Sequence, residues 1–431
     1  MTKLFISSKY YLHQIASLLL YNSVLDNPVG KAYIQLLKNI YLYSSENRTN
    51  KVTALECLQA YSTWFKTLAQ VNLSWQDYLI EQILLDSNPF SQQVQTTKID
   101  DLSPSLVAAA KHDLKILHDI YACSNQKIAQ WVQTIAQTSD NLIFWETTTN
   151  PKKFLHQADN WQQTIPQLAQ HYSRYGVGIF ARYTAFRWQN QQLIGVSQPD
   201  KIQLSEIVGY ETQKETLIKN TQFLLNGYTA LHTLLYGSRG TGKSSLVKAL
   251  RTEYSDQGLR LVEVSKSELT NLPAIVEQLQ NVPQKFIIFV DDLSFEEDDN
   301  AFKALKVVLE GNITATPSNV VVYATTNRRH LIREYFSDRP RPSDSDEIHN
   351  WDTVQEKLSF SDRFGLTLTF EPANQDTYLE IVNHLAQQSQ IKLPQTELKF
   401  RAKQWATRGN GRSGRTARQF INYLLAENSL T

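Results

Sequence analysis

The sequence predicts an α/β fold in which a parallel sheet is sandwiched between helices, with a mainly α-helical region before the sheet and a helical lid after it. From residue 230 onward, apolar runs alternate with helical patterns, and the runs are HTLLYG, GLRLVEV, KFIIFVDD, NVVVYATTN and GLTLTF. Continuous apolar strands separated by helices are typical of a parallel sheet covered on both faces. Before this part and after Pro372, apolar residues recur at helical spacing instead. The expected parts are a helical N-terminal region, a small β-hairpin or linker, the α/β core and the lid, at residues 1–175, 176–200, 201–372 and 373–431.

The N-terminal region is expected to be helical because its apolar residues recur every three or four positions. Examples are ALECLQAYSTWFKTLAQ at 54–70 and SPSLVAAAKHDLKILHDIYA at 103–122. In the second stretch, Ser103 or Ser105 can cap the helix start, and Pro104 suits its first turn.

Residues 182–198 change in character, because two runs rich in β-branched and aromatic residues flank the polar stretch QNQQ. This pattern predicts a small hairpin. Pro199 and Asp200 then close the hairpin, and the α/β core is expected to begin near Lys201.

The composition of the whole chain excludes several classes of protein. The 431 residues are 42% hydrophobic, which is ordinary for a soluble globular protein. Their net charge of +1 gives no electrostatic reason to expect nucleic acid or an anionic membrane as partner. No apolar run approaches a membrane span, and the N-terminus has no small-residue cleavage site. Cys57 and Cys123 lack metal-ligand spacing, and two buried thiols in a reducing compartment are favoured over a disulfide. We therefore expect a cytoplasmic protein.

The string LLYGSRGTGKS at residues 234–244 is an apolar strand that runs into a glycine-rich loop. It matches the P-loop pattern G-x-x-x-x-G-K-[ST] and is followed by a helical pattern, as in a P-loop NTPase. Backbone N–H groups of such a loop surround an anion, and the dipole of the next helix adds to the same positive spot. Lys243 can reach the β- and γ-phosphates, and the Ser244 hydroxyl can ligate Mg²⁺. The residues expected to hold ATP are Gly237, Ser238, Arg239, Gly240, Thr241, Gly242, Lys243, Ser244 and Ser245.

Polar residues also follow the next two strands of the core. In KFIIFVDDLSF, the apolar strand ends at Asp291 and Asp292. Asp291 can hold Mg²⁺ through its water shell, and Asp292 can orient an attacking water or accept its proton. Asn327 follows the strand NVVVYATTN, where its amide can position the water or touch the γ-phosphate. Three arginines complete the candidates: Arg363 before the last core strand, and Arg415 and Arg418 at the start of a lid helix.

The order of these motifs resembles the AAA+ ATPase superfamily over about residues 201–427. LSEIVGYETQKETL, at residues 204–217, looks like the N-terminal motif of that superfamily. The resemblance implies that Ile207, Val208 and Gly209 border the adenine of bound ATP.

The same resemblance assigns roles to residues farther along the chain. Asn327 matches sensor 1, Arg363 the arginine finger and Arg415 sensor 2. This implies a homo-oligomer, a ring or partial ring, in which Arg363 reaches the γ-phosphate of a neighbour. More narrowly, the chain looks like one uncharacterised prokaryotic family of single-module AAA+ proteins with a domain of unknown function, in the strings GSRGTGKSSLVKAL, DDLSFE, YATTNRRHLI, EKLSFSDRFGL and RSGRTARQF.

One residue departs from the superfamily pattern. Most AAA+ proteins have Glu where this chain has Asp292, and the shorter acid holds water farther from the γ-phosphate unless the backbone moves inward. The narrower family shares the Asp-Asp pair, so we expect slow hydrolysis rather than none. Glu296 can assist from the same segment, although a solvated residue at a helix start is the stronger interpretation.

We expect a Mg²⁺-dependent ATPase that couples its nucleotide state to the remodelling of a protein client. Two alternatives stay open: an ATP-gated scaffold with little hydrolysis, and a clamp-loader- or initiator-like ATPase that acts on DNA. The DNA hypothesis would use Arg328, Arg329, Arg339 and Arg341, which are better explained by a mixed-charge loop beside the subunit interface.

Overall fold

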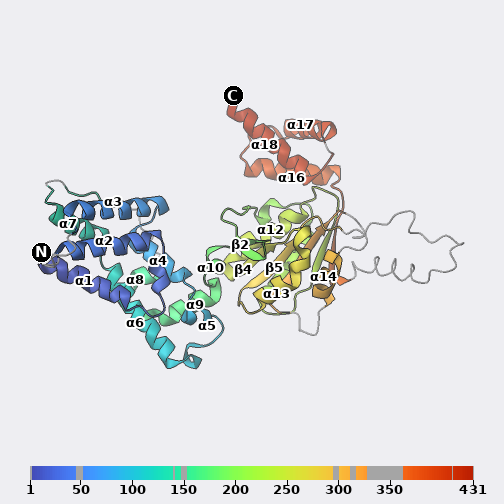
Figure 1. Cartoon of the computed structure of the whole chain (residues 1–431). Coiled ribbons are helices and arrows are strands. Elements are labelled where there is room, and N and C mark those ends of the chain that lie inside the picture. Colours follow the sequence, from blue (N-terminus) through green and yellow to red (C-terminus); the bar gives the residue numbers. More distant parts are fainter. Residues whose placement is uncertain are drawn as a thin grey trace. The chain divides into compact units, whose positions relative to one another are not determined.

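The structure is a computed structural model, and the residues that it describes are 2–44, 52–138, 141–146, 153–294, 300–310, 317–327, 363–409 and 411–430. They form two compact units, Met1–Arg182 and Tyr183–Thr431 (Figure 1). The division falls just before the first strand of the expected hairpin.

The first unit consists of helices throughout the part that the structure describes. They are α1 (Thr2–Ala16), η1 (Asn22–Leu25), α2 (Pro28–Ser44), α3 (Ala54–Val71), α4 (Trp75–Leu85), α5 (Pro89–Gln93), η2 (Ile99–Asp101), α6 (Pro104–Tyr121), α7 (Asn125–Ala136), α8 (Phe154–Gln157), η3 (Trp161–Thr164), α9 (Ile165–Tyr175) and α10 (Ile179–Arg182), where η marks a 3₁₀ helix. The start of α3 is fixed by a capping box, in which the Thr53 hydroxyl accepts a hydrogen bond from the backbone N–H of Glu56 at 3.2 Å. Helix α6 begins at Pro104 as expected, but the Ser103 side chain makes no capping hydrogen bond.

Aromatic side chains fill the core of the first unit. The rings of Tyr33 and Trp75 stack with their centroids 4.3 Å apart, and Trp64 meets Trp75 edge-on at 5.7 Å. Cys57 and Cys123 are buried and free, as expected. Burial raises the pKa of the Cys57 thiol to about 11, so it stays protonated near neutral pH.

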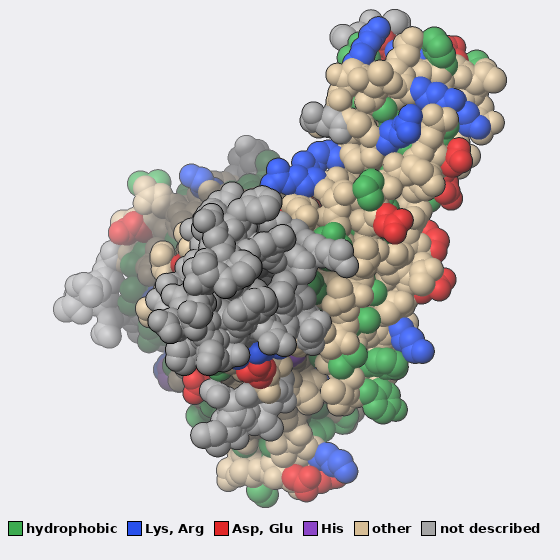
Figure 2. All heavy atoms as spheres, turned by 90° about the vertical axis from the view of Figure 1, so that its right-hand side faces the viewer, with side chains coloured by type: hydrophobic (Ala, Val, Ile, Leu, Met, Phe, Trp, Pro, Cys, Tyr) green, Lys and Arg blue, Asp and Glu red, His purple; other side chains and the backbone are tan. Residues whose placement is uncertain are grey.

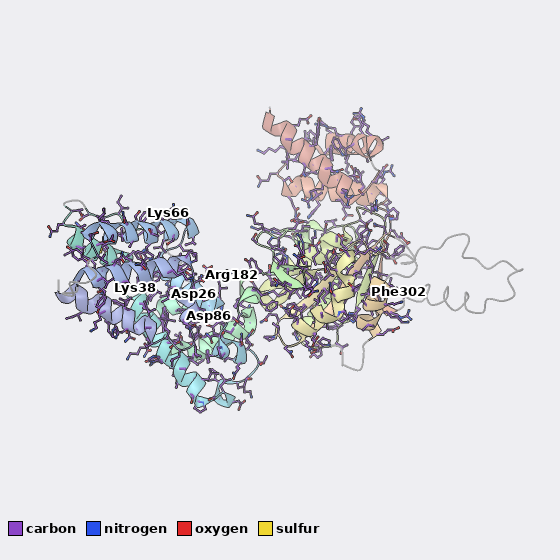
Figure 3. The ribbon with its side chains drawn as sticks, in the orientation of Figure 1. Asp26, Lys38, Lys66, Asp86, Arg182 and Phe302 are labelled. Carbon is purple, nitrogen blue, oxygen red and sulfur yellow. The ribbon has the colours of Figure 1, made fainter. Side chains whose placement is uncertain are left out.

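Two buried aspartates hold connections between helices in this unit. Asp113, on α6, accepts hydrogen bonds of 2.7–3.0 Å from the backbone N–H groups of residues 19–21. Asp86, labelled in Figure 3, follows α4 and is buried. It accepts a hydrogen bond of 2.6 Å from the Asn88 amide. Burial raises the pKa of Asp86. These contacts replace the water that both carboxylates give up on folding.

The second unit is built on a seven-stranded sheet with the order β2-β1-β4-β5-β6-β3-β7. The strands are β1 (Ala185–Gln189), β2 (Gln192–Gly195), β3 (Thr233–Gly237), β4 (Leu259–Glu263), β5 (Lys285–Val290), β6 (Val320–Thr326) and β7 (Leu366–Phe370). The five strands from β3 to β7 are the five apolar runs of the sequence, and all their pairings with one another are parallel. The predicted fold class is therefore confirmed.

The hairpin forms, and it belongs to the main sheet. Asn190 and Gln191 make its turn with positive φ values of 51° and 59°, which suit a two-residue hairpin loop. Strand β1 also pairs in parallel with β4, so that Phe186 lies opposite Val262. The β1–β2 hairpin thus extends one edge of the sheet.

Helices alternate with the strands of the second unit, and the lid follows β7 (Figure 1). They are η4 (Leu204–Glu206), α11 (Glu211–Leu225), α12 (Lys243–Tyr254), η5 (Ser255–Gln257), η6 (Lys266–Asn271), α13 (Leu272–Gln280), α14 (Asn300–Glu310), and in the lid α16 (Gln375–Gln388), α17 (Gln395–Arg408) and α18 (Gly414–Leu430). The lid helices pack around an apolar core of their own. No helix among the described residues is both long enough and apolar enough to cross a membrane.

Candidate nucleotide-binding site

Three neighbouring strands of the parallel sheet end at the candidate site. Strand β3 lies beside β6, and β6 lies beside β5, so their carboxyl ends share one edge of the sheet. The glycine-rich loop follows β3, Asp291 and Asp292 follow β5, and Asn327 follows β6. Parallel pairing therefore brings these predicted residues together, at the sheet edge where α/β folds commonly bind ligands.

The glycine-rich loop depends on conformations that only glycine adopts readily. Gly237 has φ 143°, and a Cβ there would lie 2.0 Å from the carbonyl oxygen of Phe370, so β7 leaves no room for a side chain. Gly242, with φ 92°, precedes α12 and supplies no capping side chain. The first N–H groups of α12 are thus left to an anion, which the helix dipole also favours.

Lys243 is the first residue of α12 and is buried inside the loop, at 5% exposure. Its Nζ donates hydrogen bonds to the carbonyls of Gly237 at 2.6 Å and Ser238 at 2.7 Å, and to Asn327 Oδ1 at 3.3 Å. Burial lowers the pKa of Lys243 to about 8, while Asp291 and Asp292 oppose that shift. The ammonium is thus held where the loop, β5 and β6 meet.

Asp291 and Ser244 form a pair of oxygen ligands that fits Mg²⁺. The Ser244 hydroxyl donates to Asp291 Oδ1 at 2.7 Å, and the Thr325 hydroxyl donates to the same oxygen at 2.5 Å. The described residues contain no cluster of three or more His, Cys, Asp or Glu arranged for a metal. A magnesium ion here would take its other ligands from water and phosphate, as Mg²⁺ usually does.

Asp292 has two side-chain partners at the site. Asn327 Nδ2 donates to its Oδ1 at 2.7 Å, and Arg239 Nη2 lies 3.8 Å from its Oδ2. Its backbone has φ 50°, in the left-handed region, and its N–H donates to Thr325 Oγ at 3.0 Å. The sequence reasoning missed Thr325, although the Thr-Thr-Asn ending of its strand was a signal for polar groups at this edge.

A cavity of about 900 Å³ connects these groups. The loop lines it from Arg239 to Ser245, whereas Gly237 and Ser238 do not line it and instead offer their carbonyls to Lys243. At the end expected to hold the base, the lining residues are Ile207 and Val208, with Ile381 and Leu385 of α16 and Gln419 and Asn422 of α18. Gln419 lies in the quoted string RSGRTARQF, whereas no motif marked the other three lid residues.

Gly209 contacts the lid rather than lining the cavity. Its φ is 92°. A Cβ there would lie 2.6 Å from Thr377 Cγ2, so the lid packs directly against this glycine.

The lid brings two arginines to the cavity, whose wall includes both Arg415 and Arg418. The Arg418 guanidinium donates to Glu206 at 2.6 Å, which joins the lid to η4. Figure 2 shows Lys and Arg side chains on the lid and where the lid meets the body of this unit. Arg415 and Arg418 thus add positive charge to the wall of a cavity that Asp291 and Asp292 also line.

Arg363 does not line the cavity of this chain. Two residues separate it from β7, the edge strand, and its Nε forms an ion pair with Glu310 at the end of α14. The other proposed contributors, Glu296, Arg328, Arg329, Arg339 and Arg341, lie outside the described residues.

Comparisons with known proteins give one family and a set of distant structures. Residues 181–428 match the family described as "Protein of unknown function (DUF815)". No curated protein matches the chain. Among solved structures, it is similar to the RuvB Holliday junction branch migration motor of Thermotoga maritima, at 14% identity and TM-score 0.32 over 52% of this chain and 72% of that one. A RuvB mutant gives 17% identity and TM-score 0.36 over 52% and 65%. Likeness at this level carries no conclusion about ligands or activity.

The family match agrees with the motifs and with the fold. It includes the seven strands of the sheet, the glycine-rich loop and nearly all of the lid, so these parts of the second unit belong to one family region. The match spans more than half of the chain and confirms the expectation of an uncharacterised family. The chain belongs to the DUF815 family.

Proposed function

We propose that the chain is a cytoplasmic, Mg²⁺-dependent ATPase. The observation that carries the proposal is the set of groups that line one cavity of about 900 Å³. Lys243 supplies a cation for the phosphates, Ser244 and Asp291 supply hard oxygen ligands, and Asp292 supplies a carboxylate with an amide beside it. These are the groups that phosphoryl transfer to water requires.

Each group then has a task in hydrolysis. Lys243 and the first N–H groups of α12 bind the phosphates. Ser244 and Asp291 would hold Mg²⁺, which would supply neutralisation of the phosphate charge. The water oxygen forms a bond to the γ-phosphorus while the bond to the bridging oxygen breaks, and that oxygen leaves on ADP with the electron pair. A proton of the water passes to Asp292, whose carboxylate Asn327 orients.

A ring or partial ring would complete the site. Arg363 does not line the cavity of its own chain and lies just before an edge strand. From this position its guanidinium would act on the nucleotide of a neighbouring subunit. A guanidinium from a neighbour would stabilise charge on the transferred phosphoryl group. The helical first unit would bind a protein client, which the ATP cycle would remodel.

One observation favours an ATP-gated scaffold as the second candidate. Both carboxylate oxygens of Asp292 have a protein partner, Asn327 on one and Arg239 on the other. If these partners remain with nucleotide bound, Asp292 is less free to activate water and the protein signals through binding alone.

The deciding experiment measures phosphate release and molecular mass together, with and without an ATP analogue. Lys243→Ala is the blank, since losing charge-assisted hydrogen bonds of roughly 1.5–3 kcal/mol should weaken ATP binding at least about tenfold. Lys248→Ala, on the same helix but outside the cavity, is the matched control. Turnover above the blank with a rise in mass supports the ATPase ring. A rise in mass without turnover supports the scaffold, and a wild type that binds no nucleotide overturns both.

A further inference from the structure

Arg239 is a residue of the phosphate loop whose guanidinium faces the proposed water-activating carboxylate. Its Nη2 lies 3.8 Å from Asp292 Oδ2. Asn327 occupies the other oxygen, at 2.7 Å. In this arrangement both carboxylate oxygens of Asp292 have a partner in the same chain, Arg239 on one and Asn327 on the other.

The ion pair between Arg239 and Asp292 is weak enough for Arg239 to leave it for another anion. The two side chains are 76% and 61% exposed, and 3.8 Å is long for an ion pair. Exposed pairs of this kind contribute little to stability. A terminal phosphate is a stronger partner for a guanidinium, because its oxygens match the planar donor fork and carry more charge.

The position of Arg239 places the guanidinium at the phosphate end of the cavity. Lys243 Nζ bonds the carbonyl of Ser238, the residue just before Arg239. The base end, marked by Ile207 and Val208, is bounded by η4 and the lid. A phosphate chain that starts from that end and passes Lys243 would bring its last group toward Arg239 and Asp292.

We propose that Arg239 is a γ-phosphate sensor that acts within its own subunit. When a nucleoside triphosphate arrives, the guanidinium leaves Asp292 for the terminal phosphate, and Asp292 becomes free to take a proton from water. A diphosphate lacks that group and leaves the pair in place. This inference rests on the proposed ATPase function and adds to it a mechanism by which one loop distinguishes ATP from ADP.

The test compares affinities for a non-hydrolysable ATP analogue and for ADP, both with Mg²⁺, by titration calorimetry. Arg239→Ala should weaken the analogue about tenfold or more, since one lost charge-assisted contact is worth at least that factor, and leave ADP within about twofold. Arg239→Lys should retain part of the preference, because it keeps the charge without the fork. Arg187→Ala is the matched control, since it removes a similar exposed pair, with Glu263 at 3.5 Å, away from the cavity.

A second comparison tests the exchange itself. Asp292→Asn removes the competing carboxylate, so it should bind the analogue more tightly than the wild type does, and adding Arg239→Ala should abolish that gain. Equal losses for the analogue and ADP in Arg239→Ala, or an unchanged ratio, would overturn the sensor. If the wild type nevertheless binds and hydrolyses ATP, the proposed ATPase stands without it, whereas a wild type that binds no nucleotide removes both.

Discussion

Arg415 donates its backbone N–H to the carbonyl oxygen of Gly240 at 3.3 Å, so the first turn of α18 is tied directly to the phosphate loop. Gly240 has φ 79°, and a Cβ there would lie 2.9 Å from Ser413 Oγ and 3.3 Å from Arg415 Cβ. The lid therefore rests on the loop at a residue without a side chain. A change in the conformation of the loop at Gly240 should therefore displace the start of α18.

Gly240→Ala should displace the lid as well as strain the loop. A non-glycine residue in this backbone conformation costs roughly 1–2 kcal/mol, and the new methyl group also meets the lid. Calorimetry and nucleotide titration should show a lower melting temperature and weaker binding. Gly227→Ala is the control, because Gly227 has a similar φ of 77° with nothing within 4 Å of its Cβ position. Equal effects of both variants would contradict direct contact between lid and loop.

Asp291 and Asp292 should separate on mutation, although they are adjacent. Asp291→Asn removes a negative ligand beside Ser244, so it should impair Mg²⁺-dependent binding and turnover together. Asp292→Asn should keep nucleotide bound and stop turnover, because only the proton acceptor is lost. Binding and phosphate release, each measured over a range of Mg²⁺ concentrations, distinguish the two. Wild-type turnover in Asp292→Asn would place the proton acceptor elsewhere.

Arg363→Ala should bind ATP normally and hydrolyse it far more slowly. An arginine on the transferred phosphoryl group contributes about 10³–10⁵ in rate in other P-loop enzymes. Glu310→Ala is the matched control, since it breaks the ion pair of Arg363 and leaves the guanidinium in place. If Arg363 serves only that ion pair, the two variants should behave alike.

Mixing subunits tests whether Arg363 acts on a neighbour. Arg363→Ala keeps its P-loop and Lys243→Ala keeps its arginine, so mixed interfaces can combine an intact loop with an intact finger. Part of the turnover should return when the two inactive variants are mixed. No recovery across mixing ratios, with mixed assemblies confirmed by mass, would argue against action in trans.

The stability of the second unit should decrease in mild acid because of His232. Its Nδ1 accepts a hydrogen bond from the backbone N–H of Val322 at 3.0 Å, and burial lowers the pKa of His232 from 6.5 to about 4. Between these values the unfolded chain binds more protons than the folded one, so stability is lost as pH falls from 6.5 toward 4, by roughly 3 kcal/mol at most. Unfolding of His232→Asn, which keeps an acceptor that does not titrate, should depend less on pH in this window. Exposed His112 provides the control variant, and equal slopes for all three proteins would contradict the assignment.

The strands and the loop could be predicted because their signals are local. Five apolar runs gave five parallel strands, and the spacing of Gly237, Gly242 and Lys243 predicted the phosphate loop. The grouping of Asp292 with Asn327 followed from strand order, since polar residues at the carboxyl ends of neighbouring parallel strands share an edge. The roles of these residues stay predictions until nucleotide binding and turnover are measured.

Contacts between distant segments that do not follow from strand order could not be predicted from the sequence. The hairpin was visible, but its pairing with β4 joins residues far apart in the chain. Arg239 and Asp292 carry no mark that they meet, and the lid side of the cavity comes from two helices whose packing no motif encodes. In each case the missing information is tertiary packing rather than local propensity.

The left-handed backbone of Asp292 has a consequence for how this site can vary. At φ 50°, Asp and Asn are tolerated far better than longer side chains, because their short polar groups bond locally. Replacing Asp292 with Glu would add the missing methylene and also force a longer residue into a conformation that disfavours it. The short acid at position 292 and the left-handed turn after β5 are therefore coupled: a glutamate at this position is expected to fit well only if the backbone of the turn changes as well.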